Sequence, residues 1–275
     1  MKRSMILMAL MLMVTAPASS ARADAHGAAL NGALRSEYRT TDEKARDVYR
    51  HPRETLEFFG IEPDMTIVEL APGGGWYTNI LAPLVRDEGT YIGVESDPEI
   101  YATDFPDAAK RLIKYPEMVK ADPAKYGAKG RGTWILKGDI APTNSVDMVL
   151  GFRFLHGWVS RGHADEALSK LNAVLKPGGV FAIVQHRAKE SDPRDAAAIA
   201  ETGYVKQSYV IELMKKHGFE LADSREINAN PKDRKDHPQG VWTLPPTLAL
   251  GDEDKQKYLA VGESDRMTLK FVKAK

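Results

Sequence analysis

Glycines gather at one point of the sequence, in the segment Glu69-Leu70-Ala71-Pro72-Gly73-Gly74-Gly75. Consecutive glycines allow positive φ angles and let the backbone approach a ligand closely. The apolar run 65–68 before the segment predicts a buried strand, and apolar residues with helical spacing follow it over 80–85. A helix that begins after a glycine turn offers free N–H groups to a ligand. The unit therefore predicts a site for a nucleotide-like ligand, the alternative being a tight structural turn.

A second acidic position supports this prediction. Glu95 ends the apolar run 91–95, which predicts a second strand, and lies 26 positions after Glu69. In nucleotide-binding α/β folds, an acid at this place accepts hydrogen bonds from ribose hydroxyls. We therefore predict that Glu95 is a ribose ligand; the alternative is a solvated strand end.

Strand and helix patterns alternate through the rest of the chain. Further strands are predicted at 133–136, 145–152 and 180–184, from Phe219 onward, and at 267–271, where apolar residues alternate. Helices are predicted from Pro52 to a closing Gly60, over 164–175 and over 205–216, and the prolines in 98–127 predict two or three short helices there. This alternation indicates an α/β fold with a mostly parallel sheet.

Three motifs resemble those of class I S-adenosylmethionine-dependent methyltransferases. They are Glu69-x-Ala71-x-Gly73-x-Gly75, the strand Ser145–Phe152, and the ending Leu175-Lys176-Pro177-Gly178-Gly179. Ala71 departs from the family, where glycine is usual. The resemblance covers about residues 46–273 and implies a Rossmann-like, seven-stranded, mostly parallel sheet, with helices on both faces and an antiparallel last strand. Segments 50–52, 72–77 and 241–246 further resemble a bacterial group of predicted exported methyltransferases.

The resemblance implies S-adenosylmethionine as the cofactor and places residues around it. In the family the glycine turn passes under the amino-acid part of the cofactor, and an acid after the third strand approaches the adenine amino group; the alternative for that acid is a capping role. The cofactor-binding residues expected in this way are Glu69, Ala71, Gly73, Gly75, Glu95, Asp139 and Phe152.

Acceptor-side residues are expected beyond the carboxyl ends of the fourth and fifth strands and in the long connection 229–265, which we interpret as a lid-like insertion. Methyl transfer is an in-line displacement, so a base is needed only if the acceptor must lose a proton. The candidate bases are His156, then His186 and His237; the alternative for each is a hydrogen-bonded structural histidine. The other acceptor-side candidates are Arg153 and Arg187 for an anionic group, and Trp158, Trp242 and His51.

The N-terminus predicts export. Lys2 and Arg3 precede an apolar run and a small-residue cleavage site after Ala23, as in a secretory signal peptide, so a periplasmic or secreted protein without a membrane anchor is expected after cleavage; the alternative is an uncleaved anchor. Residues 24–45 are predicted to form a loose arm, with ordering against the body as the alternative, and 46–275 the main domain. The chain has no cysteine, which excludes disulfides and thiolate metal sites.

Composition and residue spacing reduce the number of function classes to consider. Lys plus Arg and Asp plus Glu both number 38, so no basic excess favours nucleic acid as a partner. No histidine pair has the spacing of a zinc motif, and no metal is expected. We predict methyl transfer to a small-molecule acceptor. One alternative is a non-catalytic periplasmic binding protein on the same fold, which is favoured if the protein is exported away from a cytoplasmic cofactor. A second alternative is a nicotinamide-dependent oxidoreductase, which the acid before the glycines disfavours. The sequence carries no signal of oligomeric state.

Overall fold

A seven-stranded sheet forms the centre of the protein, in a computed structural model that describes residues 18–103 and 105–274. The strand order is β3-β2-β1-β4-β5-β7-β6; β7 is antiparallel to both of its neighbours, and the pairs among β1 to β5 are parallel. The predicted fold class is therefore confirmed. The strands are β1 (Thr66–Leu70), β2 (Thr90–Glu95), β3 (Arg131–Trp134), β4 (Val146–Phe152), β5 (Leu175–His186), β6 (Phe219–Arg225) and β7 (Arg266–Lys273).

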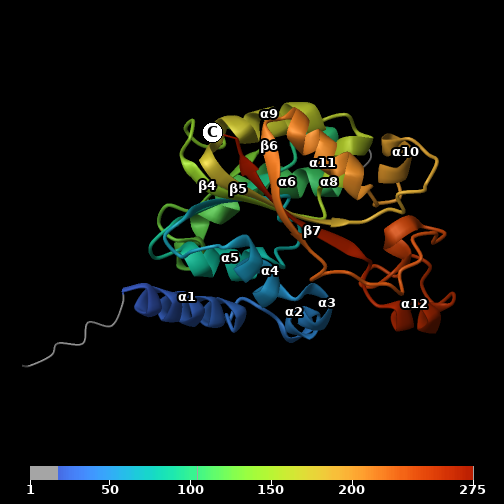
Figure 1. Ribbon diagram of the computed structural model, residues 1–275, viewed down its shortest axis with the longest axis horizontal. Coiled ribbons are helices and arrows are strands. Elements are labelled where there is room, and N and C mark those ends of the chain that lie inside the picture. The colour runs from blue at the N-terminus through green and yellow to red at the C-terminus, as the bar shows by residue number, and fades with distance from the viewer. Residues whose placement is uncertain (1–17, 104, 275) are drawn as a thin grey trace, which may run out of the picture.

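Helices cover both faces of the sheet, with α1, α4 and α5 below it and α9 and α11 above it in the view of Figure 1. The α-helices are α1 (Ala18–Leu34), α2 (Thr41–Ala45), α3 (Asp47–Arg50), α4 (Pro52–Phe59), α5 (Thr78–Val85), α6 (Pro106–Ala121), α7 (Pro123–Tyr126), α8 (Leu155–Ser160), α9 (Ala164–Val174), α10 (Ala196–Ala200), α11 (Gln207–Lys216) and α12 (Lys255–Val261). Two short 3-10 helices, η1 (Pro98–Ile100) and η2 (Gly240–Thr243), follow β2 and precede α12.

The strands bury side chains on both faces, as expected for parallel strands between two helical layers. In β1, Val68 and Leu70 enter the core shared with α8, α9 and α11, whereas Ile67 enters the core shared with α4 and α5. Glu69 lies between Val68 and Leu70 in the strand, so its side chain points toward the α5 face. The alternation of side chains along each strand therefore determines which face of the sheet a site residue can reach.

The stretch 98–127 contains three helices, η1, α6 and α7, as the sequence predicts, but α6 runs unbroken through Pro116. A proline inside a helix cannot donate the N–H that would bond the carbonyl four residues earlier. That carbonyl belongs to Leu112, and it instead accepts a hydrogen bond of 3.0 Å from Nε1 of Trp134 on β3. The tertiary contact satisfies the group that the proline leaves without a partner, so one 16-residue helix forms where shorter ones were predicted.

Residues 24–45 are mostly helical and packed against the body, which is the ordered alternative to the predicted loose arm. Helix α1 buries Leu30 and Ala33 against the body of the protein, and a capping box at Thr40 begins α2. The carbonyl of Glu43 accepts a hydrogen bond of 3.0 Å from Nε1 of Trp76, beside the glycine turn. Helix α1 begins at Ala18 and so includes the predicted cleavage position, while residues 1–17 of the predicted signal peptide lie outside the described residues.

The connection 229–265 is compact. Val241 and Leu244 of this segment are buried, and Thr243 is fully buried. Trp242 between them is 38% exposed. Among the described residues, no helix has the length and apolar character to cross a membrane.

Candidate functional site

The glycine turn after β1 is held in a left-handed backbone conformation. The φ angles are +46° at Ala71, +58° at Gly73 and +80° at Gly75. Glycine adopts these angles at little cost, whereas an alanine there is strained by about 1–2 kcal/mol. The Ala71 N–H donates to the Val94 carbonyl of β2 at 2.8 Å. The turn therefore curls toward the carboxyl end of β2, and the methyl group of Ala71 lines a cavity there.

Glu95 closes that end of β2. Its carboxylate accepts a hydrogen bond of 2.9 Å from the Gly73 N–H and interacts with the backbone N–H of Ser96. The side chain is buried, and this burial raises its pKa. An ionised carboxylate offers about four acceptor positions, so these two donors leave acceptor capacity for a ligand. The predicted ribose ligand thus lies directly beside the glycine turn.

Glu69 lies beneath the turn rather than at its ligand-facing edge. The carboxylate is 2% exposed and accepts hydrogen bonds from the Thr78 hydroxyl at 2.8 Å and the Tyr91 hydroxyl at 2.6 Å. Burial without a cationic hydrogen-bond partner raises its pKa to about 7. Its contacts join β1, β2 and the start of α5, so in this structure Glu69 supports the turn from below.

Three consecutive residues, the last residue of β2 and the two that follow it, line three different cavities. Glu95 and Gly73 line one of about 440 Å³ beside α6, Ser96 lines one of about 610 Å³, and Asp97 lines one of about 510 Å³. Asp97 is buried, and its carboxylate accepts the N–H groups of Leu136 and Lys137, both at 2.8 Å. The end of β2 is therefore the point where the cavities meet.

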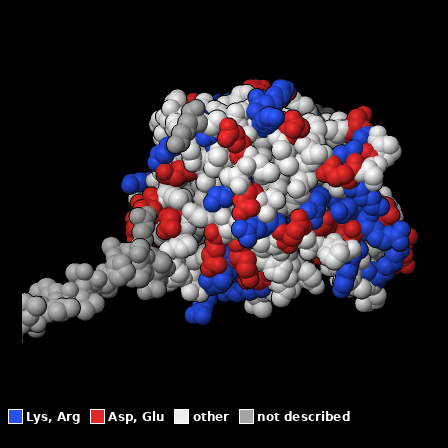
Figure 2. Space-filling view, viewed as in Figure 1, with Lys and Arg blue, Asp and Glu red and all other residues white. Residues whose placement is uncertain are grey.

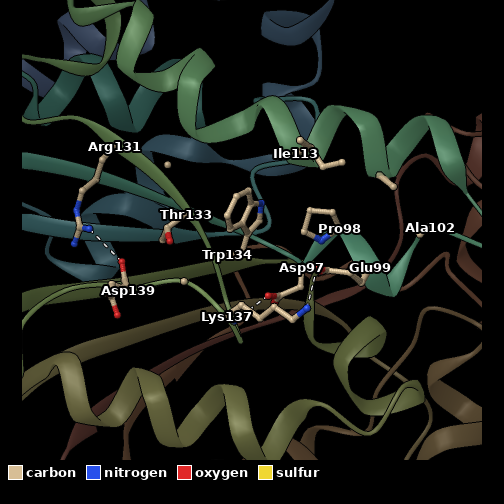
Figure 3. Close-up of a pocket in the computed structure, with 13 residues that line it drawn as sticks. Asp97, Pro98, Glu99, Ala102, Ile113, Arg131, Thr133, Trp134, Lys137 and Asp139 are labelled. Atoms are coloured by element: carbon tan, nitrogen blue, oxygen red, sulfur yellow. Dashed lines mark hydrogen bonds and ion pairs between the residues drawn. The ribbon is translucent and has the colours of Figure 1, made fainter.

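The 510 Å³ cavity, shown in Figure 3, combines flat and polar walls. Trp134, Pro98 and Ile113 contribute the apolar part. Asp139 lines the opposite side with an exposed side chain, and its carbonyl accepts a hydrogen bond of 3.1 Å from Arg131. The cavity lies against the edge strand β3, on the side of Glu95 away from β4.

The 610 Å³ cavity lies over the carboxyl ends of β1, β2 and β4. Aromatic side chains make much of its wall, and two of the predicted acceptor-side residues, Trp158 and Trp242, are among them. Arg153, Arg161, His156 and Glu201 are the charged or titratable side chains that line it. The aromatic residues of the wall are Tyr101, Phe105, Phe154, Trp158 and Trp242.

His156 faces this cavity as a neutral imidazole. Burial and the nearby Arg153 guanidinium lower its pKa to about 4. The Gln185 side chain fixes the tautomer, because its oxygen accepts the Leu155 N–H at 3.1 Å and its amide nitrogen donates to Nδ1 of His156 at 3.4 Å. With Nδ1 as the acceptor, the proton lies on Nε2. In this state His156 donates a hydrogen bond, and it is a weak base.

The other predicted histidines do not line the 610 Å³ cavity. His186 is buried with Nδ1 2.5 Å from the Ser264 hydroxyl, and burial lowers its pKa. His237 bonds Asp233 at 2.9 Å. His51 lines a separate cavity between the end of α1 and α4. Among the described residues, no three His, Asp or Glu side chains are placed to hold a metal ion.

The two predicted arginines differ. Arg187 bonds Asp265 at 3.0 Å through two nitrogens and Glu226 at 2.8 and 2.6 Å, so its guanidinium is occupied within the protein and does not reach the cavity. Arg153 has a φ of +60° and lines the cavity, and its guanidinium has no hydrogen bond or ion pair within the described part of the chain.

Phe152, predicted near the cofactor, ends β4 as a buried residue. Its ring stacks on that of Tyr77 with centroids 3.5 Å apart and planes inclined by 10°. The Tyr77 hydroxyl donates to the Arg50 carbonyl at 3.3 Å. The stacked pair forms a floor between the glycine turn and the segment before α4.

Sequence reasoning missed several residues that complete the site. Gln185 orients His156, and Glu263 binds three arginines, among them Arg50 and Arg266. Arg50 alone carried a signal, because it begins the Arg50-His51-Pro52 motif. The pairing of Glu263 with Arg50 joins residues 213 positions apart, which no local pattern reveals.

Comparison with solved structures identifies the fold. A SAM dependent methyltransferase from Aquifex aeolicus matches with a TM-score of 0.50 and 15% identity, over 83% of this chain and 92% of that one. Geranyl diphosphate C-methyltransferase from Streptomyces coelicolor, in complex with Mg2+, geranyl-S-thiolodiphosphate and S-adenosyl-L-homocysteine, matches at 0.51 and 13% over 82% and 76%. Phosphoethanolamine N-methyltransferase 2 from Haemonchus contortus, in complex with S-adenosyl-L-methionine, matches at 0.50 and 14% over 90% and 60%.

No protein-family model and no curated protein sequence matches the chain. At identities of this size the structural likeness establishes a shared fold, the Rossmann-like fold of class I methyltransferases.

Proposed function

We propose that this protein binds S-adenosylmethionine and transfers its methyl group to a small molecule held in the 610 Å³ cavity. One observation carries the proposal: a glycine turn with left-handed residues lies hydrogen-bonded to the acid Glu95 at the end of β2, and Ala71 of this turn and Ser96 after β2 line that cavity. In open α/β sheets this edge, beyond the carboxyl ends of the strands, is where ligands bind. The fold, which solved methyltransferases share, supports the same cofactor.

The residues present fit the parts of this cofactor. The carboxylate of Glu95 would accept the ribose hydroxyls with its remaining acceptor positions. The apolar and polar walls around Trp134 and Asp139 suit a flat base with an exocyclic amine. A side chain added at Gly74 would meet no atom within 4 Å, so the backbone there is open to a ligand.

The cofactor, when bound, supplies an electrophilic methyl group, and the chain's own residues align the acceptor and exclude water. Trp158 and Trp242 wall the cavity, and the Nε2–H of His156, which also lines it, is proposed to donate a hydrogen bond to the acceptor. Since His156 is a weak base in this environment, we propose acceptors that attack with an available lone pair and need no proton removed first. His156 is thus proposed as an orienting donor.

Export of the protein stays a prediction of the sequence, and we propose it with cleavage after Ala23. The domain boundaries 1–23, 24–45 and 46–275 are proposed with it.

Calorimetric titration with S-adenosylhomocysteine tests the proposal. Gly73→Arg would fill the turn, and Gly251→Arg is its matched control, because Gly251 has a similar φ of +62° in an exposed turn. We expect micromolar binding by the wild type and by Gly251→Arg, and none by Gly73→Arg. Equal affinity in both variants would show that the turn does not hold the cofactor.

A further inference from the structure

Four arginines from distant parts of the chain converge beside the 610 Å³ cavity. Arg46 and Arg50 flank α3, Arg153 follows β4, and Arg266 begins β7. Glu263, just before β7, lies among them. We call these five residues the arginine cluster.

Glu263 is the shared partner within the cluster. Arg46 bonds its carboxylate at 2.8 Å, Arg50 at 3.0 Å and Arg266 at 3.0 Å. Arg50, Glu263 and Arg266 are each less than 5% exposed. Burial opposes ionisation of Glu263, but the arginine charges outweigh it and lower the pKa of the carboxyl to about 2.

The cluster carries more positive charge than its contacts balance. Four guanidiniums face one carboxylate, which leaves three positive charges in a largely buried place. Two buried donors, Nη1 of Arg50 and Nε of Arg266, have no hydrogen-bond partner within the described residues. Arg153 has none for its whole guanidinium. An unpaired buried charge is costly, and an anion would relieve that cost.

In the described part of the chain, Arg153 forms no hydrogen bond or salt bridge with Glu263, but it interacts electrostatically with the other members of the cluster. Arg153 is the largest cause, after burial, that lowers the pKa of Arg50 to about 8. Burial lowers the pKa of Arg153 itself to about 10, with Glu263 opposing and Arg266 adding to the effect. The other titratable groups coupled to these charges are Tyr77, His156 and His186, and neither histidine supplies a negative charge. The outer surface differs, because Figure 2 shows acidic and basic side chains interspersed on the viewed face.

The position of Arg153 links the excess charge to a cavity. Arg153 lines the 610 Å³ space together with aromatic residues such as Phe105 and Trp242, and the carboxylate in that lining, Glu201, lies on an exposed residue. We propose that the cavity binds an acceptor that carries a carboxylate or phosphate group, with this group on Arg153 and an apolar body against the aromatic wall. Calling this ligand the acceptor depends on the proposed function, whereas the anion-binding site is inferred from the arginine cluster and the cavity alone.

Binding of small anions without cofactor tests the site. The probes are phenyl phosphate and benzoate, each an anion on an apolar ring, with benzyl alcohol as the uncharged control. Calorimetry should show binding of at least one anion by the wild type, at least tenfold weaker binding by Arg153→Met, and wild-type binding by Arg225→Met, a control at an exposed arginine. Failure of both anions to bind the wild type, equal affinity in Arg153→Met, or equal binding of benzyl alcohol would overturn the proposal.

Thermal unfolding separates this role from a structural one. Because the Arg153 guanidinium has no hydrogen-bond or ion-pair partner among residues 18–103 and 105–274 and is repelled by neighbouring arginines, Arg153→Met should unfold at the wild-type temperature or above it. Addition of phenyl phosphate should raise the unfolding temperature of the wild type and leave that of the variant unchanged. A variant that unfolds several degrees lower without ligand would assign Arg153 a structural role instead.

The methionine carboxylate of the cofactor is also an anion that Arg153 could bind. Comparing two cofactor analogues, one with and one without this carboxylate, distinguishes the two sources of the anion. 5′-Methylthioadenosine lacks the amino-acid part that S-adenosylhomocysteine carries. We expect Arg153→Met to bind both with wild-type affinity. Weaker binding of S-adenosylhomocysteine alone would assign the cluster to the cofactor and overturn the proposal. If the wild type binds the anions but neither nucleoside, the anion site stands and the proposed function fails.

Discussion

Two buried glutamates, Glu69 in one half of the site and Glu263 in the other, have carboxyl pKa values that their surroundings shift in opposite directions. Glu69, under the glycine turn, accepts bonds from hydroxyl groups, and burial raises its pKa to about 7. Glu263, beside Arg153, is bound by three arginines, and its pKa falls to about 2. Similar burial therefore accompanies a carboxyl group that is harder to ionise in one half and an ionised carboxylate within a cationic cluster in the other.

This difference indicates how the site divides its work. The half around the glycine turn satisfies its polar groups internally and leaves open acceptor capacity at Glu95. In the half around Arg153, which itself lines the cavity, buried donors of Arg50 and Arg266 have no hydrogen-bond partner among the described residues. The first half is built to accept hydrogen bonds and the second to donate them, which is why we assign them to the cofactor and to an anionic acceptor.

The largest expected effect comes from removing the charge of each glutamate. Glu263→Gln leaves the arginines without a counter-charge, and the free energy of unfolding at pH 8 should fall by about 3–5 kcal/mol. Glu69→Gln keeps an oxygen for the Thr78 and Tyr91 hydroxyls and should be at least as stable as the wild type at that pH. Chemical denaturation measures both values. Equal losses in the two variants would contradict the difference between the halves.

The pH dependence of the free energy of unfolding should reflect the titration of the Glu69 carboxyl group. The unfolded chain releases the proton of this carboxyl near pH 4.5, whereas the folded protein keeps it up to about pH 7. Stability should therefore fall as the pH rises between these values, by about 3 kcal/mol for this group. The slope should disappear in Glu69→Gln, measured as the difference between variant and wild-type unfolding curves from pH 4 to 8. A difference that does not change with pH would refute the shift.

A smaller effect is expected on affinity at the end of β2. Glu95→Gln keeps an acceptor for the Gly73 N–H but loses the charge that strengthens bonds to ribose hydroxyls. We expect about tenfold weaker binding of S-adenosylhomocysteine, about 1.4 kcal/mol. Glu57→Gln, at an exposed position on α4, is the control and should bind as the wild type does. Unchanged affinity in Glu95→Gln would remove this residue from the cofactor site.

The smallest effect concerns the strained position in the turn. Ala71→Gly removes a left-handed alanine and should raise the free energy of unfolding by up to about 1 kcal/mol. Ala173→Gly, on an exposed face of helix α9, should lower it by about 0.5–1 kcal/mol. Changes of opposite sign in the free energy of unfolding would support the left-handed conformation at position 71. A lower free energy of unfolding in both variants would mean that position 71 is not strained.

Much of the fold could be predicted because it depends on local patterns. Apolar runs and periodicity located all seven strands, and Gly60 ended α4 where expected, with a φ of +78°. The errors arose where a distant contact decides the structure. Trp134 donates a hydrogen bond to the carbonyl that Pro116 leaves free, so α6 continues. Helix α1 is held against the main domain by the burial of Leu30.

The site was predictable only in part, for the same reason. Arg153 and Arg187 follow neighbouring strands and look alike in sequence, but Arg187 is bound by acids 39 and 78 positions away. Arg153 has no such partners among the described residues and lines the cavity. Sequence placed both arginines beyond the ends of their strands, while the partners that decide which one is free come from the connection after β6.

The most direct test of the central claim is a crystal structure of the protein with S-adenosylhomocysteine. We predict the ribose hydroxyls on the carboxylate of Glu95, the amino-acid part along the glycine turn, and the sulfur atom facing the cavity that Arg153 lines. Density for the ligand elsewhere, or none in crystals soaked at saturating concentration, would contradict the account.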